Sequence, residues 1–353
     1  MEFGLQFFPV VALHEKPAAQ YWAECLDLTG ICDELGYTHV RTVEHYFHRY
    51  GGLSPSPLMF LSAAAMRTKN ARLITGANLP AFNHPLKLAS EIGMVDAISG
   101  GRLEVGLGRA FLPLEFARLG VSLDESRARF DEGIAILRRL IEQENVSFDG
   151  RFHRFKDATT YPRVTQTPFP RFWVAAVGTP DSFVSAGRNG HGMMGVPMTG
   201  GKMSELLGLY REAWKSAGHP GRGHVMLAFH MYCASSEQQA REDTEHHLDY
   251  YLSSVVEAAS DWTGGASSTK DYPGYDKLIA EFAKESWATQ VEKRVAWIGT
   301  PKKLVEMIRS YVDEIGGCEV ASMQVNFGVI PKDKAEASMR LFSREVMPAL
   351  RNV

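Results

Sequence analysis

Cysteine is scarce in this chain, and its spacing matches none of the common metal or redox motifs. The 353 residues include four cysteines, and no two of them form a C-x-x-C pair. Cys25 and Cys32 lie seven residues apart on one face of a predicted helix, which favours two buried thiols over a metal site. The cysteines are therefore interpreted as structural.

The chain also has little net charge and no long hydrophobic run. No long uncharged apolar segment is present, and no basic region followed by an apolar run opens the sequence, so we expect a soluble, cytoplasmic protein. The 38 basic and 41 acidic residues give a net charge of −3 without a basic stripe, which argues against nucleic acid as a partner. Hydrophobic residues at 45% and charged residues at 22% exclude the disordered and fibrous classes.

Several catalytic signatures are missing as well. There is no Walker loop, no serine nucleophile elbow and no H-E-x-x-H, and Gly106-x-Gly108 lacks the third glycine of a dinucleotide fingerprint. We expect no metal, although a metal-dependent hydrolase around His45, His48 and Glu44 stays open as an alternative. Its remaining ligands would come from other predicted strand ends, namely His14, His84 or His230. Without such motifs the site would take its reactivity from a cofactor.

The sequence does contain a regular alternation of strand-like and helix-like segments. Eight apolar segments read as strands: 3–8, 37–43, 72–79, 103–107, 172–176, 193–196, 225–233 and 320–327. Segments with helical spacing follow them, which favours a parallel sheet with right-handed crossovers. We therefore predict one α/β domain over 1–353, a (β/α)8 TIM barrel with insertions.

Two insertions interrupt this alternation. The pattern breaks over 146–171, where residues 147–155 alternate polar and aromatic side chains around Asp149-Gly150, which is typical of a small hairpin. Segment 260–275 is rich in Gly, Ser, Asp and Thr and has little periodicity. We expect a mobile active-site loop over about 260–290 that covers the barrel mouth.

Strand ends supply the candidate site residues. Segment 101–110 reads as a strand ending in Gly108 and Arg109, where glycine allows close approach of a ligand and arginine suits a phosphate. A turn and a surface ion pair are the simpler interpretation of the same residues. Thr179 and Pro180 begin a helix whose N-terminus also suits a phosphate, but Thr300-Pro301 repeats that pattern elsewhere. His45 lies at the same mouth, where a structural histidine is commoner than a catalytic base.

Longer motifs make the sequence resemble one family. The matching segments are Val43-Glu44-His45-Tyr46-Phe47, Asn83-His84-Pro85, 99–110, 126–130, Phe152–Phe155 with Tyr161-Pro162, and 341–348. In this order they are similar to the bacterial luciferase-like monooxygenases. The resemblance implies a TIM barrel with insertions, usually dimeric, that uses reduced FMN and molecular oxygen, or coenzyme F420 in a minority of members.

Position by position, the resemblance assigns His45 the role of catalytic base. It implies that the end of the third strand lies against the isoalloxazine, often through a non-proline cis peptide. It also implies that two arginines and the turn after the fifth strand bind the flavin phosphate. The implied cofactor-binding residues are Gly76, Ala77, Asn78, Gly108, Arg109, Arg127, Val177, Gly178 and Ser182.

Three positions depart from the light-emitting subunit and its relatives. Gly108 stands where that subunit has a reactive cysteine, Tyr46 where it has a second histidine, and Val177 where the phosphate turn has an acidic residue. Light emission from a long-chain aldehyde is therefore not implied.

The function implied by the resemblance is an FMNH2- and O2-dependent monooxygenase that oxidises an apolar or carbonyl-containing substrate through a flavin C4a-peroxide. A separate flavin reductase would supply FMNH2, since no nicotinamide fingerprint is present. The alternatives are an F420-dependent oxidoreductase on the same barrel and a flavin-binding protein without turnover. We expect a homodimer. Phe7, Phe111 and Trp297 either serve a bulky apolar substrate near the mouth or belong to the core.

Overall fold

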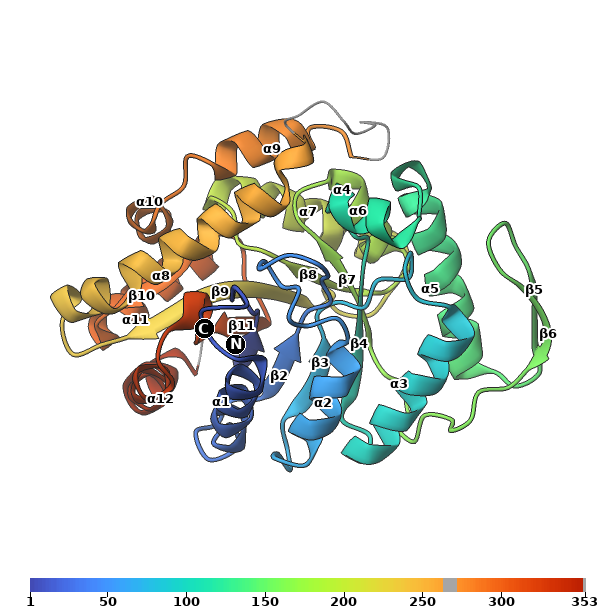
Figure 1. Ribbon diagram of the computed structural model, residues 1–353, viewed down its shortest axis with the longest axis horizontal. Coiled ribbons are helices and arrows are strands. Elements are labelled where there is room, and N and C mark those ends of the chain that lie inside the picture. The colour runs from blue at the N-terminus through green and yellow to red at the C-terminus, as the bar shows by residue number, and fades with distance from the viewer. Residues whose placement is uncertain (263–271, 352–353) are drawn as a thin grey trace.

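Eight parallel strands close into a barrel in the computed structural model, which describes residues 1–262 and 272–351. The strands are β1 (Glu2–Phe7), β2 (His39–Thr42), β3 (Arg72–Thr75), β4 (Leu103–Gly108), β7 (Phe172–Ala176), β8 (Gly192–Gly195), β9 (Val225–Cys233) and β11 (Val320–Gln324). Each strand pairs with the next in this order, and β11 pairs with β1 to close the ring. The predicted (β/α)8 barrel is confirmed (Figure 1).

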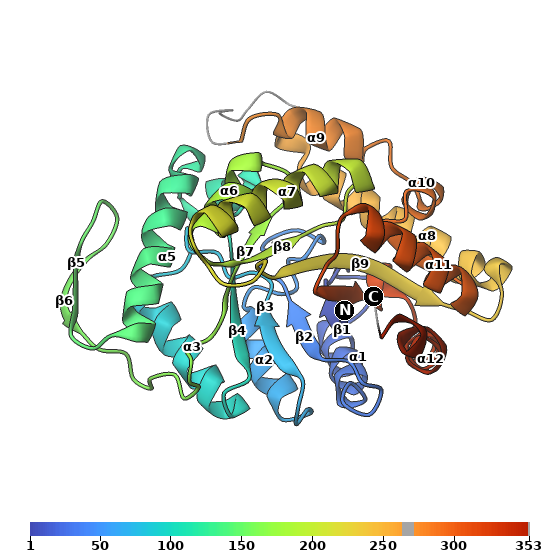
Figure 2. The same ribbon diagram turned by 180° about the vertical axis from the view of Figure 1, so that it is seen from behind.

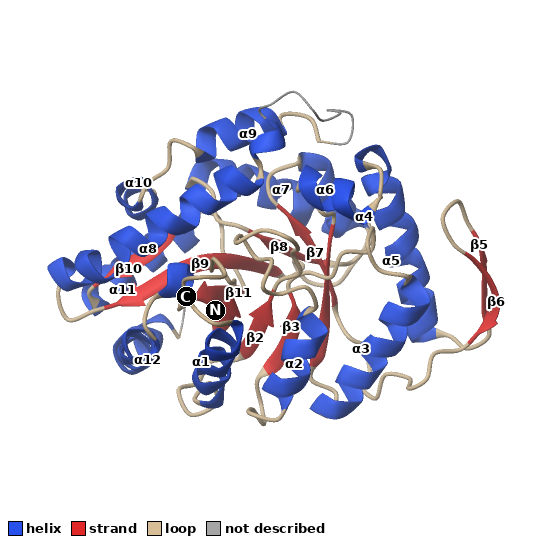
Figure 3. Cartoon of the chain, viewed as in Figure 1, coloured by secondary structure: helices blue, strands red, loops and turns tan. Residues whose placement is uncertain are grey.

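Helices surround the barrel strands, as Figure 3 shows by colour. They are α1 (Ala18–Gly30), α2 (Pro57–Ala65), α3 (Pro85–Ser99), α5 (Ser126–Glu142), α6 (Pro180–Arg188), α7 (Gly200–Ser216), α8 (Glu237–Ala258), α11 (Pro301–Glu314) and α12 (Lys332–Leu341). Short helical turns occupy Leu123–Glu125, Ser260–Trp262, Phe327–Val329, Phe342–Val346 and Met347–Leu350. Within the described residues no helix is both long and apolar enough to cross a membrane.

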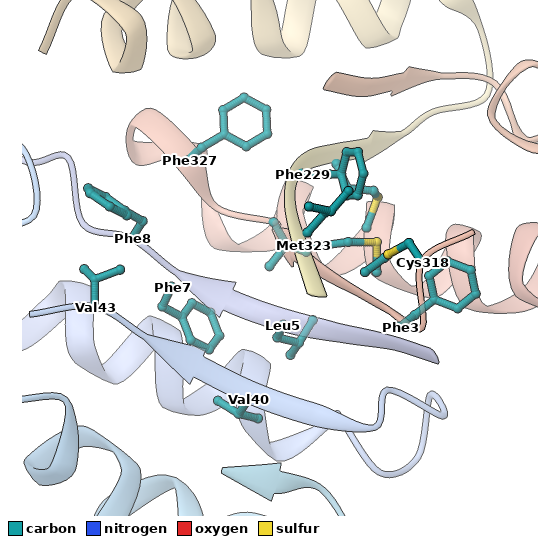
Figure 4. Packing of buried hydrophobic residues seen from close by; sticks show 14 of the residues in the cluster. Phe3, Leu5, Phe7, Phe8, Val40, Val43, Phe229, Cys318, Met323 and Phe327 are labelled. Carbon is teal, nitrogen blue, oxygen red and sulfur yellow. The ribbon is translucent and has the colours of Figure 1, made fainter. Parts of the chain in front are cut away.

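Side-chain alternation along the strands separates an outer apolar layer from the barrel interior. Leu5, Phe7 and Val40 lie in the buried apolar layer between strands and helices (Figure 4). Phe7 meets Phe60 of α2 edge-on, with ring centroids 5.6 Å apart. The residues between them on the strands face the opposite side of the sheet, because successive side chains alternate. Strands covered on both faces are typical of barrels of this kind.

An antiparallel hairpin stands apart from the barrel. Its strands β5 (Val146–Asp149) and β6 (Arg154–Ala158) pair only with each other among the described strands. Figures 1 and 2 both show the hairpin projecting beside α5, away from the barrel strands. It lies within segment 146–171, where the sequence predicts one.

Four elements were not predicted from the sequence. They are α4 (Pro113–Leu119), α9 (Tyr275–Phe282), α10 (Trp287–Glu292) and β10 (Ala296–Gly299). β10 pairs with the end of β9, from Ala296 opposite His230 to Gly299 opposite Cys233.

The segment 260–290, predicted as a mobile active-site loop, contains the helix α9 and the start of α10; its part 263–271 lies outside the described residues. Tyr275, Leu278, Ile279 and Phe282 have helical spacing and bury one face of α9. The helix was overlooked because it follows directly on the aperiodic segment.

Candidate active site

A cavity of about 220 Å³ opens at the carboxyl ends of the barrel strands. Seven of the ten residues predicted for the site line it: His45, Gly76, Ala77, Gly108, Arg109, Val177 and Ser182. Arg127 lies outside this cavity, and Asn78 and Gly178 are also absent from its lining. The carboxyl ends of several strands thus meet at one cavity, as the barrel requires.

A second cleft of about 570 Å³ adjoins the cavity. It lies between α5 and α6, and Arg109, Ala175 and Ser182 line both spaces. Arg127 lines the cleft, together with Arg138, Arg139, Asp131 and Glu142. The two arginines assigned to a phosphate by the family resemblance therefore share one cleft next to the cavity.

Helix α6 begins beside this junction. Thr179 occupies the predicted N-cap position and Pro180 the first turn, but the Thr179 hydroxyl makes no capping hydrogen bond. Thr179 instead lines the cavity. The partial positive charge at the helix N-terminus still adds to that of the arginines.

Small residues form one wall of the cavity. The peptide bond between Gly76 and Ala77 is cis, as the family resemblance implies for the end of the third strand. A Cβ built on Gly108 would lie 3.2 Å from the Cβ of Ala77 and 3.6 Å from that of Ala175. A Cβ built on Gly76 would lie 1.9 Å from Nε of Arg41, so no larger residue fits there without moving Arg41. The wall accommodates a flat group because these side chains are short or missing.

Asn78 follows the cis peptide directly but does not line the cavity. Its backbone N–H donates to Gly106 O at 2.8 Å and its carbonyl accepts from Gly108 N at 2.9 Å, so its backbone is used to resume pairing with β4. Its side-chain amide donates to Glu44 Oε2 at 3.0 Å. Asn78 therefore holds the strand ends together behind the cavity wall.

His45 is paired with an acid that the sequence did not reveal. Nδ1 of His45 lies 3.0 Å from Oε1 of Glu115, a carboxylate on α4 that is completely buried. The same oxygen accepts the backbone N–H of Tyr46 at 2.8 Å. With Nδ1 donating to this carboxylate, Nε2 is left as the basic nitrogen of His45. The arrangement can orient the ring and stabilise it when protonated.

Aromatic rings enclose the imidazole of His45. The centroids of Phe8, Tyr50 and Phe111 lie 5.5, 5.3 and 6.0 Å from its centroid. Of the three aromatic residues proposed near the mouth, Phe111 lines the cavity. Phe7 belongs to the outer apolar layer, and Trp297 stacks on Phe229 with centroids 3.7 Å apart.

Glu44 is a buried acid that lines the cavity. Its carboxylate accepts hydrogen bonds from the Tyr46 hydroxyl at 2.6 Å, Asn83 Nδ2 at 2.7 Å and Leu79 N at 3.2 Å, besides the bond from Asn78. Burial raises the pKa of Glu44 to about 7, and these hydrogen bonds oppose the rise. Glu44 can therefore exchange a proton near neutral pH.

The histidines considered for a metal do not converge. His48 Nδ1 accepts the backbone N–H of Tyr50, and His84 caps α3 by accepting from Leu86 N. His230 lies within β9 and not at a strand end. Over residues 1–262 and 272–351, no group of three or more His, Cys, Asp or Glu side chains is arranged to hold a metal ion.

Two helices cover the cavity. Tyr251, Leu252 and Val255 of α8 line it, as do four residues of α9: Tyr275, Leu278, Ile279 and Phe282. Next to α9, the ring of Tyr272 lies against the guanidinium of Arg109, 4.1 Å from ring centroid to Cζ, and its hydroxyl donates to Ala110 O. An apolar cover of this kind limits the access of water.

Comparison with known proteins agrees with this geometry. The family model described as luciferase-like monooxygenase matches residues 1–317. The chain belongs to this family. Within the luciferase-like monooxygenases, it is 29% identical over 355 residues to the oxygenase component of the flavin-dependent trigonelline monooxygenase of Acinetobacter baylyi, with 99% of this chain and 95% of the relative covered.

Two further relatives are a solved monooxygenase structure and an F420-dependent enzyme. The crystal structure of monooxygenase RslO1 from Streptomyces bottropensis superposes with a TM-score of 0.87 at 41% identity, covering 99% of this chain and all (100%) of that one. An F420-dependent glucose-6-phosphate dehydrogenase of Intrasporangium calvum is 29% identical over 350 residues, covering 94% of this chain and 95% of the relative. Relatives of comparable similarity thus include both flavin-dependent and F420-dependent enzymes.

Sequence reasoning missed Glu115 and the helical form of the cover, which was expected as a loop over 260–290. Glu115 lies 70 positions from His45 in a segment without a motif, and only the fold brings the two together. The apolar spacing within α9 is the one signal that was present in the sequence.

Proposed function

We propose that this protein is the oxygenase component of a two-component monooxygenase that uses FMNH2 and O2. One observation carries the proposal: a wall of small residues adjoins a cleft lined by arginines, and together they fit a planar ring that bears a phosphate tail. The wall consists of Gly76, Ala77, Gly108 and Ala175, and the cleft includes Arg109 and Arg127. Bound FMNH2 would supply two electrons, so that one atom of O2 enters the substrate and the other leaves as water.

His45 is proposed as the catalytic base. Glu115 would hold Nδ1 and leave Nε2 to take a proton from a group bound in the cavity or to return it. The apolar cover from α8 and α9 would keep water from the reacting groups. The largely apolar lining supports an apolar or carbonyl-containing organic substrate.

The flavin-binding assignment rests on Gly76, Ala77, Gly108, Arg109, Arg127, Val177 and Ser182, which line the cavity or the cleft. Gly178 lies in the turn between Val177 and the start of α6 and is kept as a backbone contact to the phosphate. Asn78 is kept as a support of the wall.

The test combines reduced-flavin binding with oxygen labelling. Apo-protein is titrated anaerobically with photoreduced FMN, then mixed with ¹⁸O2 and a panel of apolar ketones and aldehydes. We expect reduced FMN to bind, and one ¹⁸O atom to enter a product in the wild type but not in His45→Ala, which still binds FMN. Binding of reduced F420 in place of FMNH2 would favour the F420-dependent oxidoreductase. Binding of FMN without product from any substrate would favour a flavin-binding protein without turnover.

A separate flavin reductase is proposed as the source of FMNH2. The chain has no nicotinamide fingerprint, and the name of the Acinetobacter relative describes an oxygenase component. Turnover should proceed with photoreduced FMN and should fail with FMN and NADH until a reductase is added. Turnover with NADH and FMN alone would contradict this partner.

A homodimer is also proposed. Met59 on α2, Met66 at its end, and Met94 and Ile98 on α3 are exposed, and the two helices pack side by side. An exposed apolar face on two neighbouring helices favours burial against a second copy of the chain.

A further inference from the structure

Four polar side chains form a row across the inner face of four neighbouring strands. Gln6 of β1 lies opposite Gln324 of β11 on one side and Arg41 of β2 on the other, and Gln324 lies opposite His230 of β9. All four line the cavity, and none is more than 7% exposed. We call these four residues the floor row.

The packing around the floor row does not by itself demand polar side chains at these four positions. Ile74 continues the same level on β3, between Arg41 of β2 and the buried Glu104 of β4, and packs with Met194 and Met226 in an apolar cluster inside the barrel. The sequence neighbours of the row, such as Leu5 and Phe7, face the apolar layer shown in Figure 4. An apolar side chain is thus accommodated at this level, and apolar side chains fill the core of most barrels.

The row contains a buried cation without an acidic partner. Nη1 of Arg41 donates to Gln6 Oε1 at 3.0 Å, and Nη2 donates to Gly76 O at 3.1 Å. Among the ion pairs of the described residues, none includes Arg41, and Glu44, the acid that lines the same cavity, is held by its own four donors. Burial lowers the pKa of Arg41 to about 9, which still leaves it charged at neutral pH.

Three atoms of the row also have no hydrogen-bond partner among the described residues. They are Nε of Arg41, Oε1 of Gln324 and Nε2 of His230, all buried. Burial lowers the pKa of His230 to about 3, so its ring is neutral and offers one N–H. A side-chain amide can turn to present its NH2 group in place of its oxygen. Buried polar groups are nearly always satisfied, so unpartnered atoms around one cavity indicate a bound molecule that completes them.

We propose that the floor row is a subsite for a delocalised oxyanion of a molecule bound in the cavity, with Arg41 as the charge partner and Gln6, Gln324 and His230 as neutral donors. The planar guanidinium and the amides suit a carboxylate or an enolate of the substrate. The anionic pyrimidine edge of a reduced flavin is a second source of the same chemistry. The inference rests on the proposed function only for the identity of the bound molecule, which is the substrate or the flavin. Binding of an anion to the subsite does not require turnover.

Gln6→Glu is the decisive variant. It is nearly isosteric and places a carboxylate where Oε1 already lies 3.0 Å from Arg41 Nη1. If Arg41 lacks an anionic partner in the apo-protein, the carboxylate of Gln6→Glu supplies one. The melting temperature of the apo-protein should then rise, and binding of an external anion should weaken. Arg41→Met removes the cation, and Gln238→Glu on the exposed face of α8 is a matched charge control.

The readout is calorimetric binding of benzoate and of its neutral analogue benzamide to flavin-free protein, together with the relative affinities for reduced and oxidised FMN. For a substrate anion, we expect the wild type to prefer benzoate at least tenfold and Gln6→Glu and Arg41→Met to lose this preference. For the flavin source, Gln6→Glu should lower the affinity for reduced relative to oxidised FMN at least tenfold, with no benzoate preference in the wild type. If Gln6→Glu changes neither ratio, or if Gln238→Glu changes them as much, the subsite is refuted. Neither binding ratio depends on turnover. Both can therefore still be measured, and still test the subsite, if the monooxygenase proposal fails.

Discussion

Nδ1 of His45 lies 3.0 Å from Oε1 of Glu115, and that one oxygen also accepts the backbone N–H of Tyr46. The carboxylate therefore fixes both the ring and the chain segment that carries it. Because the side chain of Glu115 is wholly buried, its charge acts on the imidazole with little screening by water. Glu115 is in this sense a positioning residue for the proposed base.

Replacement of Glu115 by Gln should separate this positioning from folding. Gln retains an oxygen that can accept both hydrogen bonds, so FMN affinity and thermal stability should stay near those of the wild type. Loss of the negative charge should lower kcat by about 10–100-fold, since a neutral partner stabilises the protonated ring less. Steady-state kinetics with photoreduced FMN measure the effect. His45→Ala should lower kcat by about 10²–10⁴-fold with FMN binding retained. An unchanged kcat in Glu115→Gln would show that the carboxylate is only structural.

Gly76→Ala tests the contact between the cavity wall and Arg41. The added Cβ would meet Nε of Arg41 at 1.9 Å, and the side chain of Arg41 is enclosed and cannot move away freely. We expect the free energy of unfolding to fall by roughly 1–3 kcal/mol in urea denaturation. Gly30→Ala at the end of α1 is the control, since its Cβ would meet nothing within 4 Å. In an Arg41→Ala background the cost of Gly76→Ala should shrink, and an unchanged cost would disprove the clash.

The strand order and the position of the cavity follow from the sequence, because alternating strand and helix patterns are local signals. The segment 103–107, its glycine at 108 and Arg109 were placed at a strand end by composition alone, and the structure puts β4, Gly108 and Arg109 there. The third strand was predicted to run to Leu79, but β3 ends at Thr75 before the cis peptide. Apolar composition does not reveal such a break.

Partners that are distant in the sequence could not be predicted. Glu115 is one of many acids until α4 brings it to His45, and the polar residues at positions 6, 41, 230 and 324 align only when the register of four strands is known. The sequence shows a polar residue within each of these apolar strands. A single inward polar residue does not predict a site, however, until the residues beside it on the neighbouring strands are known. Register is set by the closed barrel and not by any local pattern.

Arg127→Ala should weaken binding of FMN but not of riboflavin. Arg127 lines the cleft next to the cavity, where the phosphate is proposed, and riboflavin lacks that group. We expect the ratio of the FMN and riboflavin dissociation constants to change by about tenfold or more, as measured by flavin fluorescence quenching. Arg154→Ala in the exposed hairpin is the matched control. An equal loss of both ligands would place Arg127 outside the phosphate site.

Met59→Glu combined with Met94→Glu should dissociate the proposed homodimer. Both side chains are exposed, on α2 and α3, and two charges would be buried without partners in an apolar interface. Analytical ultracentrifugation should show a dimer for the wild type and a monomer for the double variant. Leu13→Glu is the control, since Leu13 is exposed but lies outside α2 and α3. A wild-type monomer, or equal dissociation by Leu13→Glu, would contradict this interface.

Glu44→Gln should alter how stability depends on pH. The pKa of Glu44 is raised by burial from an ordinary value near 4.5 to about 7, so the folded protein binds this proton more tightly than the unfolded chain does. The resulting stability is fully present below pH 4.5 and is lost as the pH rises through 7. Between pH 4.5 and pH 8, the free energy of unfolding of the wild type should therefore fall by roughly 3 kcal/mol relative to that of Glu44→Gln.

Urea denaturation of flavin-free wild type and Glu44→Gln across this pH range measures that difference. Other titrating groups, such as the buried His39 and His191, contribute equally to both proteins and cancel in the comparison. Glu212→Gln on the exposed face of α7 provides the same substitution at the surface. Since the loss of hydrogen bonds in Glu44→Gln is the same at every pH, it shifts the difference by a constant. A difference that does not change with pH would mean that Glu44 stays ionised in the folded protein, and it would remove this residue as a source of protons for the cavity.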